Sequence, residues 1–482
     1  MGRQMRNLGF YSAAALVATW LAFLLPLASA QTEAPYYQRV EEGEAFPIEL
    51  SGPRYERGYL FVPQSADPDD PLILKLPVIR IRALEPNPVL APVLFLPGGP
   101  GVGSLRAAFY PGAYPGTQTR DFIILGRRGT RYAEPSLRCE PIGQALVDAA
   151  DTGMETLQQA FDACQSTLFE QGVRLGAYHS AASASDIEAL RAALGLEQVS
   201  IFALSYGTRL ALTYARDYPG RVQSMVLEAP LPHNVRFDDS YSQNLRLALE
   251  RVTQICAEQE ECARAFPDLG DRFFSAIQAA PRECEPGRQT VCQADIVDSV
   301  PLGSPDDLVW APLRMEQALA RQTPPKSGAR GVPSDFDWGV RLSVWCSEAL
   351  PHAQRWNGPL DDSFAGLDAA TFLPDTCRSW GAPVRPLSDR AVTVSDAPTL
   401  ILAGELDILT PPDWGYEAAR TLNRSRVISI PYGFHSETTN WDGDGCAMSL
   451  AVRFFSSPDE MIADTSLAPC IEARAEPAFI TR

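Results

Sequence analysis

Short apolar runs recur along the chain, and several of them are followed by a segment whose apolar residues repeat at helical spacing. Such runs, rich in Val, Ile and Leu, are typical of buried strands. Strands that alternate with amphipathic helices predict an α/β fold, with a mostly parallel central sheet and helices on both faces. The expected strands cover residues 92–96, 122–125, 199–204, 222–227, 399–403 and 427–430, and the expected helices cover residues 185–194, 207–216, 414–422 and 448–455.

The region before the first of these buried runs has a different pattern. Residues 58–62, 73–76 and 78–82 are strand-like, and a turn rich in Pro and Asp at 63–71 follows the first of them. Runs bounded by such turns predict antiparallel strands that open the sheet. Further along, residues 139–178 have a helical pattern.

The alternation of strand and helix stops between residues 233 and 390. This stretch contains amphipathic helical segments, six of the ten cysteines and Pro-rich joints, and a strand pattern returns only afterwards. We therefore expect an inserted, mainly helical cap at 233–390. It would divide the α/β core into a first part at 31–232 and a C-terminal part at 391–482.

The first thirty residues have the pattern of a signal peptide. Arg3 and Arg6 precede an apolar stretch at 13–25, and Ala28-Ser-Ala30 resembles a cleavage site. The alternative is an uncleaved membrane anchor, but the apolar stretch is short for a span, which needs roughly 20 residues. We expect secretion or export to the periplasm, with no stable membrane association after cleavage.

The charge of the chain narrows the choice of partners. The net charge is −18, and removal of residues 1–30 makes it more negative because it removes two arginines and no acid. A strongly acidic chain without a basic tract is not expected to bind nucleic acid or an anionic membrane.

Ten cysteines lie beyond the predicted signal peptide. An even number in an exported chain favours disulfides. Metal sites are the alternative, but the chain has no C-x-x-C motif and its four histidines are scattered. Connectivity does not follow from sequence, and the simplest guess joins neighbours in order: 139–164, 256–262, 284–292, 346–377 and 446–470.

One serine lies where a strand pattern changes to a helical one. The strand at 199–204 runs into Ser205, and Ala203 and Gly207 are small residues two places on either side. This is the nucleophile-elbow pattern G-x-S-x-G of the α/β-hydrolase fold, with Ala in its first position. The sharp turn strains the serine backbone, and small neighbours let strand and helix approach closely.

A serine nucleophile needs an imidazole to take its proton and a carboxylate to orient that imidazole. In the α/β-hydrolase order Ser, acid, His, the acid and the base follow late strands. Asp407 and His435 occupy those two places, whereas the other three histidines precede the elbow or lie in the expected cap. Glu405 and Glu228 are alternative acids. We expect the triad Ser205, His435 and Asp407.

The run at 92–96 leads directly into Pro97-Gly98-Gly99-Pro100-Gly101. In this fold the loop at that place supplies half of the oxyanion hole, and the residue after the nucleophile supplies the other half. We expect the backbone N–H groups of Tyr206 and of Gly98 or Gly99 to bind the oxyanion. An ordinary Gly/Pro turn is the alternative for this loop.

Several segments resemble the prolyl aminopeptidases and the tripeptidyl aminopeptidases, and most closely the secreted tripeptidyl-aminopeptidase-like branch. Residues 97–101 resemble their H-G-G-P-G loop, and 126–130 resemble their D-x-R-G turn. Residues 404–411 match their G-x-x-D-x-x-T-P acid loop, and Gly58-Tyr-Leu-Phe-Val-Pro63 is similar to their C-G-x-L-x-V-P opening. The departures are Arg57, Gly126 and Ala203, where the family has Cys, Asp and Gly, and Leu96-Pro97, which stands where the family often has a histidine.

Two cysteine-containing segments extend the resemblance. Cys346-Ser-Glu348 and Cys377-Arg-Ser-Trp380 are similar to paired elements near the family's acid loop. The resemblance implies an exopeptidase that holds the free amino terminus of its substrate with acids under the cap, and Glu348 is the position that it suggests. A capping or solvated glutamate is the alternative.

The sequence therefore predicts an exported serine exopeptidase that forms an acyl-enzyme, needs no metal or organic cofactor and takes a peptide or other small molecule as its partner. Two alternatives remain open. One is an esterase with the same triad, and the other is a catalytically inactive binding protein on the same scaffold.

Overall fold

The computed structural model describes residues 34–145, 154–236, 240–282, 290–321, 323, 336–352, 374–439 and 443–482. The predicted signal peptide at 1–30 lies outside these residues. Residues Pro35–Arg482 form one compact unit. Within the described ranges, no helix combines the length and the apolar character that a membrane span requires.

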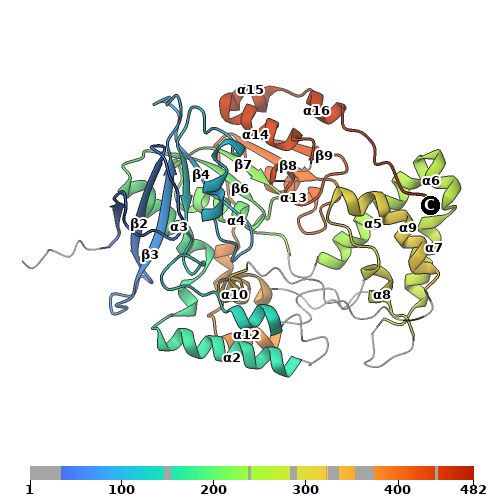
Figure 1. The fold of residues 1–482 in the computed structure, drawn as a ribbon, viewed down its shortest axis with the longest axis horizontal. Coiled ribbons are helices and arrows are strands. Elements are labelled where there is room, and N and C mark those ends of the chain that lie inside the picture. The colour runs from blue at the N-terminus through green and yellow to red at the C-terminus, as the bar shows by residue number, and fades with distance from the viewer. Residues whose placement is uncertain are drawn as a thin grey trace, which may run out of the picture. The chain divides into compact units, whose positions relative to one another are not determined.

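The described strands form one nine-stranded sheet in the order β1-β2-β3-β5-β4-β6-β7-β8-β9 (Figure 1). The pairs from β5 to β9 are parallel, and β1, β2 and β3 join them by antiparallel pairing. This confirms the predicted α/β class and its mostly parallel sheet. The strands are β1 (Tyr36–Val40), β2 (Tyr55–Pro63), β3 (Ile73–Ile81), β4 (Val93–Leu96), β5 (Phe122–Leu125), β6 (Val199–Leu204), β7 (Val222–Glu228), β8 (Thr399–Gly404) and β9 (Ser425–Ile430).

The opening strands differ from the prediction in two ways. The runs 73–76 and 78–82 belong to one strand, β3, because Pro77 keeps its place in the ladder opposite Tyr59. Its carbonyl accepts the backbone N–H of Gly126 at 2.7 Å, and this contact needs no N–H from the proline. Strand β1 was not predicted, since it is short and carries mostly polar or half-exposed residues.

The two faces of the sheet are covered by different helices. Alternate strand residues point to opposite faces, so Leu94 belongs to one buried cluster and its neighbour Phe95 to the other. The first cluster includes residues of α2 (Met154–Glu170), α3 (Ser180–Ala193) and α4 (Tyr206–Asp217), and the second includes residues of α14 (Cys446–Ser456), α15 (Pro458–Ala463) and α16 (Pro469–Glu472) (Figure 1).

Helices replace strands between β7 and β8, among the residues described there. One group has its own buried cluster, which also contains Leu406 and Phe434 from the loops after β8 and β9. Residues of α10 and α12 pack instead on the cluster that contains α2. The boundaries of the cap stay a prediction. The helices are α5 (Tyr241–Glu258), α6 (Glu260–Ala265), α7 (Leu269–Ala279), α8 (Gln293–Asp298), α9 (Pro305–Leu319), α10 (Trp338–Val344) and α12 (Pro374–Trp380).

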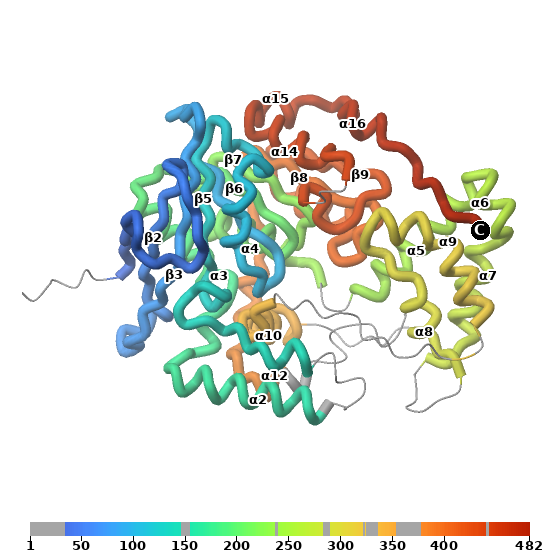
Figure 2. The backbone as a smooth tube through the Cα atoms, in the orientation of Figure 1, coloured from blue at the N-terminus to red at the C-terminus, as the bar shows by residue number. Residues whose placement is uncertain are grey.

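The chain ends against this helical group. Figure 2 shows the last residues leaving α16 and running toward α9. The backbone N–H of Ile480 donates to the carbonyl of Val309 in α9 at 2.8 Å. The C-terminal residues therefore connect the core to the helices inserted between β7 and β8.

Helix α3 begins earlier than the sequence pattern predicts. Helix α3 begins at Ser180 instead of 185, because the Nδ1 atom of His179 accepts the backbone N–H of Ala182 at 3.2 Å and caps the helix. Helix α13 (Pro412–Ala419) lies close to its predicted place, whereas α14 is followed by α15 and α16.

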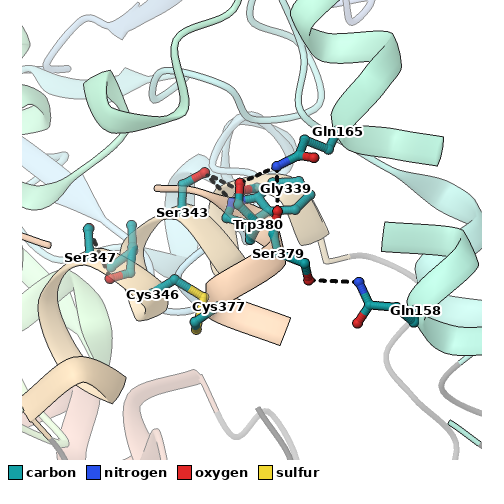
Figure 3. The surroundings of a disulfide bond; sticks show 10 residues. Gln158, Gln165, Gly339, Ser343, Cys346, Ser347, Cys377, Ser379 and Trp380 are labelled. Carbon is teal, nitrogen blue, oxygen red and sulfur yellow. Dashed lines mark hydrogen bonds between the residues drawn. A yellow bond between two sulfur atoms is a disulfide. The ribbon is translucent and has the colours of Figure 1, made fainter. Parts of the chain in front are cut away.

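Four of the five predicted disulfides are confirmed: Cys139–Cys164, Cys256–Cys262, Cys346–Cys377 and Cys446–Cys470. Cys284 of the fifth predicted pair lies outside the described residues. Figure 3 shows how the 346–377 bridge is embedded: Gln165 of α2 donates to the carbonyls of Ser379 and Trp380, and the Trp380 indole donates to Ser343 of α10.

Candidate active site

Ser205 lies at the sharp turn between β6 and α4. Its backbone has φ 53° and ψ −125°, which is strained for a residue with a side chain. The Ser205 N–H donates to the carbonyl of Glu228 at 2.9 Å and so ties the turn to the end of β7. A Cβ atom at Gly207 would lie 2.0 Å from the carbonyl oxygen of Leu96, which explains why glycine is needed there.

Asp407 and His435 follow β8 and β9 and are in contact. The Nδ1 atom of His435 lies 2.8 Å from Oδ2 of Asp407. The buried carboxylate also accepts the Thr410 hydroxyl at 2.7 Å and the backbone N–H groups of Leu409 and Thr410 at 2.8 and 2.9 Å. These three bonds hold the Asp407 carboxylate in the orientation in which it contacts the His435 imidazole.

The surroundings of His435 favour its charged form. Burial by itself would lower the pKa of His435, but the charge and hydrogen bond of Asp407, together with the charge of Glu228, outweigh burial and raise it. Because Nδ1–H is donated to Asp407, Nε2 is the ring nitrogen left to accept a proton from another group.

The two alternative acids have other partners. The carboxylate of Glu228 accepts the backbone N–H of Thr438 at 2.6 Å and also its hydroxyl. Burial raises the pKa of Glu228 to about 7, against the opposing effects of these bonds and of His435. Glu405 pairs with Arg251 of α5 at 2.7 Å and accepts the N–H of Tyr432. Of the three carboxylates, Asp407 is the one bonded to His435.

The Gly-rich loop after β4 lies directly against the serine. A Cβ atom at Gly98 would come within 2.9 Å of the Ser205 Cβ and 3.3 Å of its Oγ. Within the described part of the chain, the backbone N–H groups of Gly98 and Gly99 donate to no backbone carbonyl outside helices and strands. Parallel strands β4 and β6 are neighbours, so their carboxyl ends bring Gly98 and Tyr206 to the same edge of the sheet.

Sequence reasoning missed the residues that hold this loop. Arg127, just after β5, donates from Nη2 to the carbonyls of Gly98 and Val102 at 2.9 and 2.8 Å. Arg341 of α10 donates to the carbonyl of Gly99 at 3.2 Å. The register of β5 beside β4 could have suggested Arg127, whereas nothing in the sequence pattern brings Arg341 to this place.

Glu348 is buried, and both of its oxygens already have partners. Oε1 accepts the backbone N–H of Ser180 at 2.5 Å, and Oε2 accepts the Ser180 hydroxyl at 2.8 Å. The Nε atom of Arg209 lies 3.5 Å from Oε2. The Ser180 hydroxyl is also 2.9 Å from the hydroxyl of Tyr206, so this network reaches the residue after the nucleophile.

The described residues contain no group of three or more His, Cys, Asp or Glu side chains that could hold a metal ion.

Comparison with known proteins places the candidate residues inside two matched regions. A family model described as alpha/beta hydrolase fold matches residues 91–262, which include Gly98, Gly99, Ser205 and Tyr206. A second, described as TAP-like protein, matches residues 364–466, which include Asp407 and His435.

Several curated proteins are similar in sequence. The putative hydrolase YuaR of Escherichia coli is 28% identical over 235 residues, 45% of each chain, so the match spans less than half of that relative. The serine protease Hip1 of Mycobacterium tuberculosis is 24% identical over 446 residues, 81% of this chain and 82% of that protein. A tripeptidyl aminopeptidase of Streptomyces lividans is 23% identical over 383 residues, 70% and 69% of the two chains.

Proposed function

This chain belongs to an α/β-hydrolase family that includes serine peptidases, and on that premise we propose that it is an exported serine exopeptidase. It would remove residues from the amino terminus of peptides through an acyl-enzyme. The peptidase class is supported by the TAP-like match and by the relatives named as a protease and an aminopeptidase. Export is supported by the four described disulfides, which form in oxidising compartments.

The observation that carries the proposal is the 2.8 Å contact between His435 and Asp407 at the same sheet edge as the strained Ser205. In the proposed reaction, Ser205 Oγ attacks the scissile carbonyl carbon while Nε2 of His435 takes its proton. Asp407 holds the Nδ1–H tautomer and stabilises the imidazolium. The oxyanion of the tetrahedral intermediate accepts hydrogen bonds from the backbone N–H groups of Tyr206 and of Gly98 or Gly99.

The remaining steps pass this proton to the leaving group and then regenerate the free enzyme. His435 protonates the leaving amine as the carbon–nitrogen bond breaks, which releases the amine and leaves the amino-terminal acyl group as an ester on Ser205. A water molecule then attacks the ester carbon while His435 takes its proton, and His435 passes that proton to Ser205 Oγ as the ester bond breaks and the acid is released. No other group is required to balance protons or electrons.

We propose that Glu348 binds the free amino terminus of the substrate. Its carboxylate lies in one network with Tyr206 through Ser180. The nearby Arg209 competes with this role, because a substrate ammonium would have to share Oε2 with the guanidinium. A purely structural role, holding the first turn of α3, is the alternative that experiment must separate.

The proposal is tested with matched fluorogenic peptides, free and acetylated at the amino terminus, together with a short-chain ester and the Ser205→Ala variant. We expect release from free-amine peptides alone, and its loss in Ser205→Ala. Cleavage of the ester with no cleavage of either peptide would refute the peptidase hypothesis and indicate an esterase. Failure of Ser205 to react with a fluorophosphonate would refute the serine-hydrolase reading altogether.

Glu348→Gln addresses the amino-terminal contact separately. If Glu348 binds the ammonium, the variant raises KM for free-amine peptides and leaves the reaction of Ser205 with a small ester unchanged. An equal loss on both substrates, with a lowered Tm, would contradict the binding role and favour the structural one.

A further inference from the structure

The Gly98–Gly99 loop is held from behind by a buried arginine. Arg127 follows β5, whose parallel pairing with β4 brings the carboxyl ends of both strands to the same edge. Its Nη2 atom donates to two carbonyls of the loop, those of Gly98 and Val102. One guanidinium nitrogen therefore joins both sides of the glycine turn.

The hydrogen bond from Arg127 to the Gly98 carbonyl determines the direction of the Gly99 N–H group. The carbonyl of Gly98 and the N–H of Gly99 belong to the same planar peptide group and point in opposite directions. Anchoring the Gly98 oxygen thus fixes where the Gly99 N–H points. Gly99 has φ +117°, and a glycine in this region loses much conformational freedom when it is ordered. Without an anchor, this peptide plane would have many orientations.

Arg127 also contacts the other half of the expected oxyanion hole. Its guanidinium carbon lies 5.6 Å from the ring centroid of Tyr206, the residue whose N–H is the second expected donor. The Arg127 side chain therefore touches both of the segments that must be placed relative to each other.

The positive charge of Arg127 is poorly balanced. The residue is 5% exposed, and its Nε and Nη1 atoms have no hydrogen-bond partner among the described residues. The nearby acid is Asp337, whose carboxylate accepts the backbone N–H of Arg131, whereas the Tyr206 side chain is an uncharged phenol because burial raises its pKa. A buried cation without a bonded carboxylate is costly, and its potential favours negative charge at the neighbouring loop.

We propose that Arg127 is a positioning residue for the oxyanion hole: it orients the Gly98–Gly99 peptide and supplies positive potential behind it. The inference rests on the proposed function in one respect, namely that Ser205 forms a tetrahedral adduct. It does not depend on whether the acyl group comes from a peptide or an ester. The simpler alternative is that Arg127 only stabilises the fold.

Three variants separate these roles. Arg127→Met removes the hydrogen bonds and the charge, Arg127→Gln keeps a donor without charge, and Arg127→Lys keeps the charge with a different donor geometry. Arg120→Met is the matched control, because Arg120 is another buried arginine that donates to backbone carbonyls, at Ala91 and Phe455, away from Ser205.

Each variant is compared with the wild-type chain by four measurements. These are Tm, the active fraction titrated with a fluorophosphonate, kcat and KM per active site on p-nitrophenyl acetate, and inhibition by a peptide aldehyde, whose hemiacetal oxygen occupies the oxyanion position. The acetate ester makes the test independent of any preference for peptides.

We expect Arg127→Met to lower kcat by about 10²-fold, the effect of misplacing a reacting group by about 1 Å, with KM nearly unchanged and aldehyde inhibition weakened in proportion. Arg127→Gln and Arg127→Lys should have kcat values and aldehyde inhibition between those of Arg127→Met and the wild type. Arg120→Met should lower Tm without changing kcat per active site.

Unchanged kcat and aldehyde inhibition in folded Arg127→Gln and Arg127→Lys would overturn the inference, whatever happens to Tm. That result leaves the proposed function intact. Conversely, a wild-type chain that cleaves the ester but no peptide refutes the aminopeptidase proposal and leaves the inference about Arg127 unaffected. Wild-type Ser205 that fails to react with the fluorophosphonate overturns both.

Discussion

Replacing Gly207 by alanine tests whether the close approach of α4 to the Gly-rich loop is essential. The new Cβ atom would lie 2.0 Å from the carbonyl oxygen of Leu96 and 2.8 Å from that of Pro97. Ordinary contact begins at 3.4 Å, so the two segments must separate by about 1.4 Å. Both obstructing atoms are backbone, and Leu96 is paired with Ala203 in the ladder between β4 and β6. The shift therefore falls on the start of α4 or on the loop at 97–99.

Either movement separates the two sets of N–H groups that we expect to bind the oxyanion. A displacement of about 1 Å at a reacting centre costs about 10²-fold in rate, and overpacking costs about 1–3 kcal/mol of stability. We therefore expect Gly207→Ala to lower kcat by at least about 10²-fold and to lower Tm.

The assay is turnover of the preferred substrate per active site, beside a thermal melt. Gly303→Ala is the control, because no atom lies within 4 Å of its added Cβ and its φ is not positive. A Gly207→Ala variant with wild-type kcat would refute the reasoning, since it would show that the loop and α4 can separate without consequence for the reaction.

Four other predictions rest on the described contacts. Asp407→Asn should lower kcat by about 10⁴-fold, because the amide favours the wrong tautomer of His435. In the wild type, kcat/KM should fall as pH drops through the raised pKa of His435, so the acid limb of the pH profile should lie above the ordinary value of 6.5. An acid limb at or below 6.5 would contradict this. Glu228 has its pKa raised to about 7 by burial, so its contribution to stability is present below its ordinary value of 4.5 and is lost as pH rises through about 7; Glu228→Gln should remove this part of the pH dependence of Tm, and parallel Tm–pH curves would contradict it. Replacing both Cys346 and Cys377 by alanine opens a cross-link with a sequence separation of 31 residues and should lower the free energy of unfolding in urea by about 3–4 kcal/mol. An unfolding free energy equal to that of the oxidised wild type would contradict a stabilising bridge.

The sheet could be predicted from sequence because each core strand is a contiguous apolar run whose length and flanking turns identify it. The exceptions follow from local chemistry. Strand β1 lacks such a run and exists through pairing with β2, which a single-strand pattern does not reveal. The early start of α3 depends on a histidine cap, and histidine is not one of the usual capping residues.

The contact between Asp407 and His435 could be anticipated because strand order alone brings the ends of β8 and β9 together. The supports around it could not. Thr438 and Arg341 reach the site through loop conformations and packing between distant segments, and no periodicity encodes these. Thr410 lies in the acid loop that the sequence pattern matches, but its bond to the Asp407 carboxylate follows from the loop conformation. Glu348 was singled out by resemblance, and its bonds to Ser180 became visible only in three dimensions.

The residues that precede the proposed acid and base, Leu406 and Phe434, are buried in the cluster formed by α5 to α9. The two loops thus have their apolar anchors in a part of the chain that supplies no triad residue. Exchanging these helices for those of a relative, in order to alter substrate preference, would transplant the packing partners of both loops as well. A successful chimera must carry Leu406 and Phe434, or compatible replacements, together with the new helices, and the same coupling limits how independently the two regions can diverge in sequence.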